Sequence, residues 1–377
     1  MRVPLLDLSR QYAPLREELL QAVERVLDSQ QFVLGDEVTA LEREMAAFLG
    51  ADAALGCGSG TDAIWLALAA CDIRPGDEVL TTPFSFFATA SAIVRTGARP
   101  VFVDIDPVTF NIDAHKVEEF LQQARSVRLK AILPVHLYGQ CADMDTLVRA
   151  SSVCKLPVIE DAAQAFGATW RGQRAGSLGT AAAFSFYPTK NLSAAGEAGA
   201  VTTSSPALAD ELRALRNHGM RQRYRHDSLG WNCRMDGIQG AILRVKLKHV
   251  EPWNHARRER AAFYDDALPK AGLTGNAGPL VLPKTAPEAG HIYHQYVVRA
   301  KRRDELREYL TSRGVGTEVY YPSPLPVQRP LQYLGYAEES FPEAARAARE
   351  VLALPMFPEL RREEQQYVVD CIAEFYS

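Results

Sequence analysis

Several features that mark special classes of protein are missing from this sequence. Its six cysteines form no Cys-x-x-Cys pair and show no zinc-ligand spacing with histidine, so we expect free, buried thiols and no metal. The first residues contain no apolar core of a secretion signal, and no stretch reaches the roughly 18 apolar residues of a membrane span. The sequence therefore predicts a cytoplasmic protein with no membrane partner.

A strong charge of either sign is also lacking. The formal net charge of −4 creates no global field that would attract nucleic acid, so anionic ligands must be held by local sites. Internal repeats and low-complexity segments are missing too. What remains is an ordinary globular composition, 47% hydrophobic and 23% charged, and a length of 377 residues that predicts about two domains.

Short β-rich runs alternate with helical segments between about residues 50 and 205. This alternation is typical of βαβ units and predicts an α/β fold with a mostly parallel sheet covered by helices on both faces. Asp77, Asp106 and Asp143 stand where turns or helix caps belong. The expected strands are Glu78–Thr82, Arg99–Asp104, Lys130–His136, Pro157–Glu160, Ala181–Phe186 and Gly199–Thr203, and the expected helices are Thr61–Ala70, Asp113–Ala124 and Met144–Cys154.

A long amphipathic stretch, Asp236–Leu268, predicts a helix or a kinked pair broken at Pro252, and it marks the domain boundary. We expect a large domain at 1–245 and a smaller α+β domain at 246–377, with residues 1–30 packing on either one. The elements expected in the smaller domain are the strands His291–Arg299 and Val315–Tyr321 and the helices Arg303–Ser312, Pro342–Leu352 and Glu363–Phe375, while another helix is expected near Leu15–Leu27.

Three short segments carry residues suited to chemistry. The glycine-rich turn from Gly56 to Thr61 precedes a helix, where backbone N–H groups can bind a phosphate, although a simple capped turn has the same pattern. Glu160 and Asp161 end an apolar strand, so one carboxylate can enter a cleft while the other points away. Lys190 follows a buried strand and a proline, and in a cleft a desolvated lysine becomes the neutral amine that forms a Schiff base. Each segment alone has a plain structural alternative: a cap, a strand-end turn or a solvated lysine.

The order of the three segments is more informative than any one of them. A glycine-rich turn, an aspartate about a hundred residues further on, and a Ser-x-x-x-x-Lys pattern from Ser185 to Lys190 follow the order of fold type I pyridoxal-phosphate enzymes. Such enzymes need a lysine for the cofactor aldehyde and a carboxylate for the pyridine nitrogen. Asp161 is the candidate for the second role.

The motifs resemble those of the DegT/DnrJ/StrS-type nucleotide-sugar aminotransferases over nearly the whole chain, in GCGSGTDAIWLAL, RPVFVDIDPVTFNID, ILPVHLYGQCADMD, PVIEDAAQAFGA, FSFYPTKNL, LRNHG, RVKL, YYPSPLPVQ and LALPMFPEL. The resemblance implies the aspartate-aminotransferase-like fold, with pyridoxal 5′-phosphate as cofactor. It also implies the role of each cofactor residue: Lys190 binds the aldehyde, Asp161 pairs with the pyridinium, Gln164 contacts the phenolic oxygen, Phe86 stacks on the ring, and Gly60, Thr61 and Ser185 hold the phosphate. For Phe84 and Phe87, which stand beside Phe86, the alternative role is to fill the hydrophobic core.

The same resemblance implies a homodimer with shared active sites, in which Asn232 reaches the phosphate of the neighbouring subunit. The alternative for Asn232 is an ordinary turn before a long helix. Tyr187, Tyr320 and Tyr321 match positions at the sugar-nucleotide pocket, but tyrosines beside proline also pack at ordinary edges. The run Gly196-Glu197-Ala198-Gly199 departs from the glycine-rich pattern of many relatives. Because Ala198 lacks the easy access of glycine to positive φ, this loop is free to take another path.

The implied activity is transamination of a nucleotide-linked keto sugar, with glutamate as the expected amino donor. Gln164 in place of histidine resembles relatives that aminate carbon 3. Lys190, once free, is placed to move a proton as general base and then acid. Two alternatives are a sugar dehydratase, which carries histidine where Lys190 stands, and a non-catalytic regulator that binds the cofactor or a sugar nucleotide.

Overall fold

The computed structural model describes residues 1–123 and 126–377. Its centre is a four-stranded and a three-stranded sheet, joined edge to edge by parallel bridges from Ile132 to Val158 and from Val135 to Asp161. β9 runs antiparallel to both of its neighbours, so the sheet is mostly parallel, as predicted. In spatial order the strands are β1 (Ala53–Cys57), β9 (Gly199–Thr203), β8 (Ala181–Ser185), β5 (Ile159–Asp161), β4 (Leu129–Leu133), β2 (Glu78–Thr81) and β3 (Arg99–Phe102).

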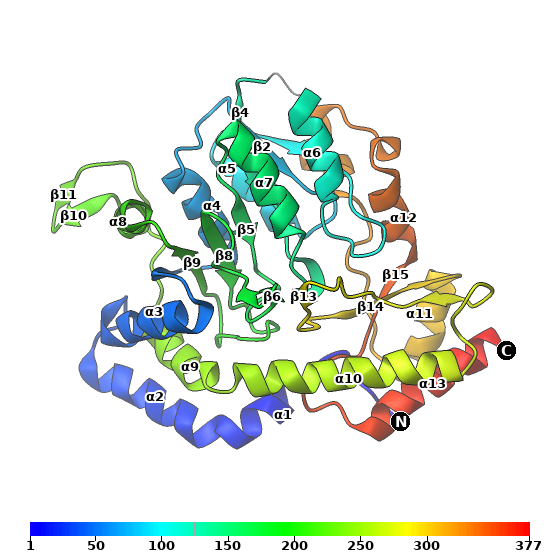
Figure 1. The fold of residues 1–377 in the computed structure, drawn as a ribbon. Helices are drawn as coiled ribbons and strands as arrows, with labels where there is room; N and C mark the ends of the chain where they lie inside the picture. The colour runs from blue at the N-terminus through cyan, green and yellow to red at the C-terminus, as the bar shows by residue number, and fades with distance from the viewer. Residues whose placement is uncertain (124–125) are drawn as a thin grey trace.

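Helices cover both faces of this sheet (Figure 1). Alternate side chains of one strand point to opposite faces: in β2, Leu80 joins the core cluster with α3, α6, α7 and α9, whereas Val79 joins the cluster with α4, α5 and α8. This double cover explains why the strands are apolar on both faces. The helices are α3 (Gly35–Leu49), α4 (Gly60–Ala70), α5 (Phe87–Arg95), α6 (Ala114–Gln123), α7 (Met144–Cys154), α8 (Pro206–Leu215) and α9 (Gly237–Leu247).

A second core lies under a three-stranded antiparallel sheet in the order β12-β14-β15. The remaining strands form two small sheets. One is three-stranded, in the order β13-β6-β7, and the other is the projecting hairpin β10–β11 (Figure 1). The elements are β6 (Thr169–Trp170), β7 (Gln173–Arg174), β10 (Met220–Gln222), β11 (Arg225–His226), β12 (Leu280–Val281), β13 (Ala289–Gly290), β14 (Tyr296–Ala300), β15 (Val351–Leu354), α10 (Val250–Lys270), α11 (Arg303–Ser312), α12 (Pro342–Glu350) and α13 (Arg362–Tyr376).

The N-terminal segment touches both parts of the molecule. α1 (Leu8–Tyr12) is followed by α2 (Arg16–Ser29), which packs against α9 through a small cluster of its own. Val3 pairs with Val315, and Arg10 forms an ion pair with Glu364 of α13. The domain boundary between residues 245 and 246 stays a prediction, and it falls inside α9.

Most expected elements are present, including the helix near Leu15–Leu27, but four differ in kind or extent. Val315–Tyr321 is not a strand; only isolated bridges from Val315 and Glu318 tie it to its neighbours. The helix Pro342–Leu352 ends at Glu350, because the apolar run from Val351 pairs with β14. The strand predicted from His291 starts at Tyr296, because Tyr293 adopts a positive φ of 47°. The stretch Asp236–Leu268 breaks between α9 and α10 rather than at Pro252, which lies in the first turn of α10, where its missing N–H is tolerated.

Several smaller expectations can also be checked. Asp143 caps α7 and accepts a hydrogen bond from the Thr146 backbone, and Asp77 and Asp106 accept backbone N–H groups in their turns. Ala124, the expected last residue of the helix Asp113–Ala124, lies outside the described residues. All six cysteines are free, but Cys154 is exposed at the end of α7 and Cys71 is half-buried, so the expectation of buried thiols was wrong for these two. No helix within residues 1–123 and 126–377 is long and apolar enough to cross a bilayer.

Candidate active site

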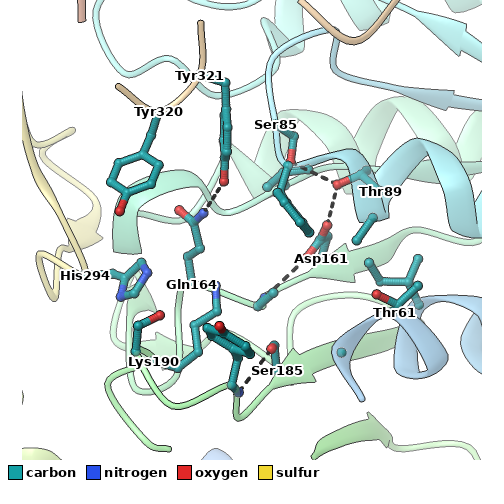
Figure 2. Close-up of a pocket in the computed structure, with 18 of the residues that line it drawn as sticks. Thr61, Ser85, Thr89, Asp161, Gln164, Ser185, Lys190, His294, Tyr320 and Tyr321 are labelled. Atoms are coloured by element: carbon teal, nitrogen blue, oxygen red, sulfur yellow. Dashed lines mark hydrogen bonds between the residues drawn. The ribbon is translucent and has the colours of Figure 1, made fainter. Parts of the chain in front are cut away.

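A pocket of about 670 Å³ lies at the carboxyl ends of the parallel strands. Its floor comes from the turn after β1, the segment after β2, the end of β5 and the end of β8. Two segments from the C-terminal half, around His294 and Tyr321, close the opposite side (Figure 2). Carboxyl ends of parallel strands meet at one edge of a sheet, which is where α/β folds bind ligands.

Asp161 ends β5 and is buried with its carboxylate directed into this pocket. The Thr89 hydroxyl donates to Asp161 Oδ2 at 2.7 Å, and the Ala163 backbone N–H lies 3.3 Å from Oδ1. Ser85 Oγ lies 2.9 Å from Thr89 Oγ1 and extends this chain (Figure 2). Burial raises the pKa of Asp161, while the hydrogen bond from Thr89 and the charge of Lys190 oppose the rise. A carboxylate held in this way is fixed in position and attracts a protonated partner.

Glu160, the neighbour of Asp161 in the strand, faces away from the pocket, and both of its carboxylate oxygens already accept hydrogen bonds. Its carboxylate accepts backbone N–H groups of Gly176, Leu178 and Gly179 at 2.8–2.9 Å and contacts His136 Nε2 at 2.9 Å. Because His136 Nδ1 accepts from a backbone N–H, Nε2 carries the proton and donates to Glu160. Of the two carboxylates that the sequence left open, Asp161 is therefore the one available to a ligand.

Lys190 lies in the turn after β8 and lines the pocket. Its backbone N–H donates to the Tyr187 carbonyl at 2.8 Å, which fixes the turn. Burial lowers the pKa of the Lys190 amine to about 8, and the charge of Asp161 opposes this shift. The neutral amine, which is the nucleophilic form, is therefore much more accessible than in an ordinary lysine.

Gly60 and Ser185 meet where α4 begins. Gly60 is buried, and a Cβ placed on it would lie 2.5 Å from Ser185 Cβ, so only glycine allows this approach. Ser59 caps α4 by accepting the Asp62 N–H at 3.1 Å, and Thr61 lines the pocket in the first turn. Helix N–H groups, a threonine and a serine hydroxyl therefore face one spot, as a phosphate site requires.

Gln164 links the floor of the pocket to its C-terminal wall. Its Oε1 accepts the Tyr138 backbone N–H at 2.7 Å, and its Nε2 donates to the Tyr321 hydroxyl at 3.1 Å (Figure 2). The Tyr138 hydroxyl donates in turn to the Tyr320 carbonyl. Segments far apart in the sequence are thus fixed relative to each other at the site.

The remaining aromatic candidates lie around the mouth of the pocket. Phe86 is 60% exposed and Tyr187 is 48% exposed, and both line it, as Tyr320 and Tyr321 do. Phe84, in contrast, is fully buried in the core, so for it the core alternative holds. Phe86 is therefore the exposed phenylalanine of this segment that lines the pocket.

Asn232 is not among the residues that line this pocket. It is exposed on the loop before α9, and its Oδ1 accepts from Arg234 Nε at 3.0 Å. The structure therefore does not bring Asn232 together with the other predicted site residues of its own chain.

The loop that departs from the usual pattern forms without strain. Ala198 does not have a positive φ, and its carbonyl accepts the Phe186 N–H at 2.8 Å. Glu197, from the same loop, lines the pocket and is exposed.

Thr89 and His294 are two of the pocket residues that were not predicted from the sequence. Thr89 follows Phe86 by three positions, and helical spacing after the aromatic motif was the signal available. His294 comes from a distant segment, and its Nδ1 lies 3.0 Å from Asn191 Oδ1. Because Asn191 Nδ2 already donates to Asn254, its oxygen accepts from His294, and burial lowers the pKa of His294 well below its usual value. No local sequence motif predicts this neutral histidine.

The chain matches the model of the DegT/DnrJ/EryC1/StrS aminotransferase family over residues 14–373. It is 50% identical to a pleiotropic regulatory protein of Geobacillus stearothermophilus, over 100% of this chain and 99% of that one. It is 45% identical to a Streptomyces venezuelae dTDP-3-amino-3,4,6-trideoxy-α-D-glucose transaminase, over 99% of this chain and 96% of that one.

Solved structures give the same result. The crystal structure of S. venezuelae DesV in complex with a ketimine intermediate superposes with a TM-score of 0.94 at 44% identity, covering 99% of this chain and 98% of that one. NtdA from Bacillus subtilis, with bound cofactor PMP, gives a TM-score of 0.90 at 32% identity and covers 99% and 85%. The chain therefore belongs to the DegT/DnrJ/EryC1/StrS aminotransferase family and has the fold of pyridoxal-phosphate-dependent aminotransferases.

Proposed function

We propose that this protein transfers an amino group from glutamate to carbon 3 of a nucleotide-linked keto sugar, with pyridoxal 5′-phosphate as cofactor. The observation that carries the proposal is the convergence of Lys190, Asp161, Gln164 and Ser185 in one pocket. The S. venezuelae relative supports the substrate class and the carbon, because its name describes a 3-amino sugar nucleotide.

The residues present fit this cofactor. The close approach of Gly60 to Ser185 leaves helix N–H groups and a hydroxyl for the phosphate. Asp161 supplies a fixed carboxylate for the ring nitrogen, and Lys190 supplies an amine of lowered pKa for the aldehyde. Phe86 offers an exposed aromatic face to the ring. The Gln164 amide donates one hydrogen to the Tyr321 hydroxyl, so its second hydrogen is available to the phenolic oxygen of the cofactor.

When bound, the protonated pyridine ring takes up the electron pair released at the donor's α-carbon. Asp161 holds the proton on the ring nitrogen, because a buried anion stabilises a cation beside it. Lys190 Nζ removes the proton from the donor's α-carbon and later returns one to the sugar carbon that receives the nitrogen. Tyr187, Tyr320 and Tyr321 line the mouth of the pocket, where the sugar would bind.

We also propose a homodimer in which Asn232 completes the phosphate site of the neighbouring subunit. Its exposure and its position outside its own chain's pocket support this role. The test mixes Lys190→Ala with Asn232→Ala under conditions that exchange subunits. A mixed dimer with shared sites has one site with both lesions and one with neither, so about half the activity per dimer should return. No recovery, with subunit exchange verified, would mean that Asn232 serves its own chain's site or only the fold.

A regulatory role has one observation in its favour, since the Geobacillus relative is named a regulatory protein. A sensor of sugar nucleotides, however, does not need a lysine whose pKa is lowered to about 8 beside a buried aspartate. Lys190 also argues against a dehydratase, in which histidine would stand at this position. The free cysteines agree with a cytoplasmic enzyme.

The function is tested with purified protein, glutamate and a panel of 3-keto and 4-keto nucleotide sugars, with products identified by mass spectrometry. We expect a mass change from ketone to amine for 3-keto substrates, together with 2-oxoglutarate. Amination of 4-keto substrates alone would overturn the assignment of the carbon. No amination of any panel member by the cofactor-loaded protein would overturn the enzymatic proposal and favour the regulator.

A further inference from the structure

His294 lines the active-site pocket beside Lys190 but has no part in the chemistry of the cofactor (Figure 2). Its side chain is buried, with 8% of its surface exposed. The backbone around it is held on two sides: the Gln295 N–H donates to the Tyr138 carbonyl at 3.3 Å, and Arg257 Nη1 donates to the His294 carbonyl at 3.1 Å. The imidazole therefore has a fixed place in the wall of the pocket.

A chain of buried amides determines which nitrogen of this imidazole carries the proton. The Phe166 carbonyl can only accept a hydrogen bond, so the part of Asn254 that lies 3.1 Å from it is the donor Nδ2. Asn254 Oδ1 therefore accepts from Asn191 Nδ2 at 2.7 Å, and Asn191 Oδ1 is left to accept from His294 Nδ1 at 3.0 Å. Asn191 and Asn254 are 4% and 0% exposed, so solvent does not compete for these groups. The proton of the neutral ring is held on Nδ1.

The other ring nitrogen, Nε2, is consequently a lone-pair acceptor. Burial, and then the charge of the neighbouring Lys190, lower the pKa of His294 well below its usual value, so Nε2 stays unprotonated at neutral pH. Nε2 has no hydrogen-bond partner within residues 1–123 and 126–377, and unlike Gln295 Oε1 it is not sealed inside the protein. Because Nδ1 is turned to Asn191, outside the lining of the pocket, Nε2 is on the edge of the ring that is left to meet a ligand.

An unprotonated ring nitrogen selects the kind of group that binds to it. It accepts a hydrogen and repels the lone pairs of a carboxylate, so it does not bind the carboxylates of glutamate. Under the proposed function, the ring nitrogen, phenolic oxygen and phosphate of the cofactor already have partners in Asp161, Gln164 and the turn at Gly60. The amino group that is transferred lies at Lys190. The hydrogen donors that remain close to the reacting carbon are the hydroxyl groups of the sugar.

We propose that His294 is a specificity-determining residue, whose Nε2 accepts a hydrogen bond from a sugar hydroxyl on a carbon next to the one that receives the nitrogen. This inference rests on the proposed transamination and adds which polar group of the keto sugar is recognised. The position of the hydroxyl follows from the place of His294 beside Lys190, because the Lys190 amine must reach the reacting carbon. Asn191 and Asn254 act through His294, since they keep its proton on Nδ1.

The substitution His294→Asn separates the roles of the two ring nitrogens. The asparagine Nδ2 takes the place of Nδ1 and can still donate to Asn191, whereas nothing replaces Nε2. Binding is measured by calorimetry on protein loaded with pyridoxamine phosphate. The probes are dTDP-glucose and UDP-glucose, which have no ketone to react, and their 2-deoxy and 4-deoxy analogues, which each lack one hydroxyl beside carbon 3.

Wild-type protein should bind one of the two deoxy analogues about fivefold to tenfold more weakly than the parent sugar, the factor for one lost hydrogen bond. His294→Asn should bind that analogue and the parent with equal affinity, because the acceptor of the hydroxyl is gone. The matched control is His291→Asn. His291 is buried in the same segment but does not line the pocket, and asparagine can keep its contact with the Tyr293 N–H, so this variant should discriminate as the wild type does.

The two half-reactions distinguish recognition of the sugar from an effect on Lys190. His294→Asn should raise the KM of the keto sugar while leaving the half-saturating glutamate concentration within about twofold, because the donor offers no hydrogen to Nε2. A larger loss in the donor half-reaction than in the acceptor half-reaction would overturn the proposal. The same discrimination between parent and deoxy sugars in His294→Asn as in the wild type would also overturn it.

The state of the ring is tested without ligand or turnover by ¹⁵N NMR of histidine-labelled protein, in which the signals of His294 are those missing from His294→Asn. We expect a neutral ring with its proton on Nδ1 at neutral pH, and a proton on Nε2 would overturn the proposal. If His294→Asn does not fold, equal binding of the parent and both deoxy sugars by the wild type, or no binding of any, would still overturn it. Failure of the wild type to aminate any keto sugar would instead overturn the proposed function, whereas the binding series would still decide the role of His294.

Discussion

Replacing Asp161 with asparagine isolates the charge of the proposed pyridine partner. The amide has nearly the shape of the carboxylate and can keep contacts with Thr89 Oγ1 and the Ala163 N–H, since a hydroxyl can donate or accept. The fold and the pocket should therefore persist. What disappears is the negative charge beside the ring nitrogen and Lys190.

Removing one partner of a buried charge pair costs about 3–5 kcal/mol, which corresponds to a loss of about 10²- to 10⁴-fold in rate. Loss of the Asp161 charge does not make Lys190 more protonated; it makes Lys190 less protonated. The charge of Asp161 raises the pKa of Lys190, so its removal lowers that pKa further and leaves more neutral amine at pH 7. A slower Asp161→Asn variant therefore cannot be explained by a more strongly protonated lysine.

The assay is steady-state turnover with glutamate and keto sugar, normalised to bound cofactor measured by absorbance. Glu160→Gln is the matched control, because Glu160 faces away and accepts three backbone N–H groups and the His136 ring proton. It should lower the melting temperature while leaving turnover per folded, loaded molecule within a few-fold. Near-native turnover of Asp161→Asn would refute the role assigned to Asp161.

Three further predictions follow from the same pocket. Borohydride should fix the cofactor covalently to Lys190, and Lys190→Ala should lose turnover; a reduced cofactor found on another lysine by peptide mapping would contradict this. Since the pKa of Lys190 is lowered from 10.5 to about 8, the rate at which the apo-protein takes up the cofactor aldehyde should rise with pH with a midpoint near pH 8 and level off at higher pH, where the neutral amine predominates; a midpoint near 10.5 would be inconsistent with burial of this amine. Gly60→Ala should weaken cofactor binding because its Cβ would lie 2.5 Å from Ser185 Cβ, and an unchanged affinity in a fluorescence titration would refute the phosphate site.

The sequence predicted which strands would carry the site, because strand ends can be located without knowing the whole fold. Asp161 and Ser185 each end an apolar run, and parallel neighbours bring such ends to one edge. His294 could not be found in this way. Its position depends on the pairing of β13 with β6, which is a long-range contact without a local pattern.

The adjacent carboxylates of Glu160 and Asp161 show where local reasoning ends. Alternation along a strand requires the two side chains to point to opposite sides, so the sequence established that one of them could enter a cleft. Which one enters depends on what covers each face. The turn from Gly176 to Gly179 supplies N–H groups to Glu160, whereas Thr89 of α5 approaches Asp161 from the pocket side. The choice between two chemically similar residues is therefore made by segments that follow or precede them in the chain, and those segments are placed only when the sheet has formed.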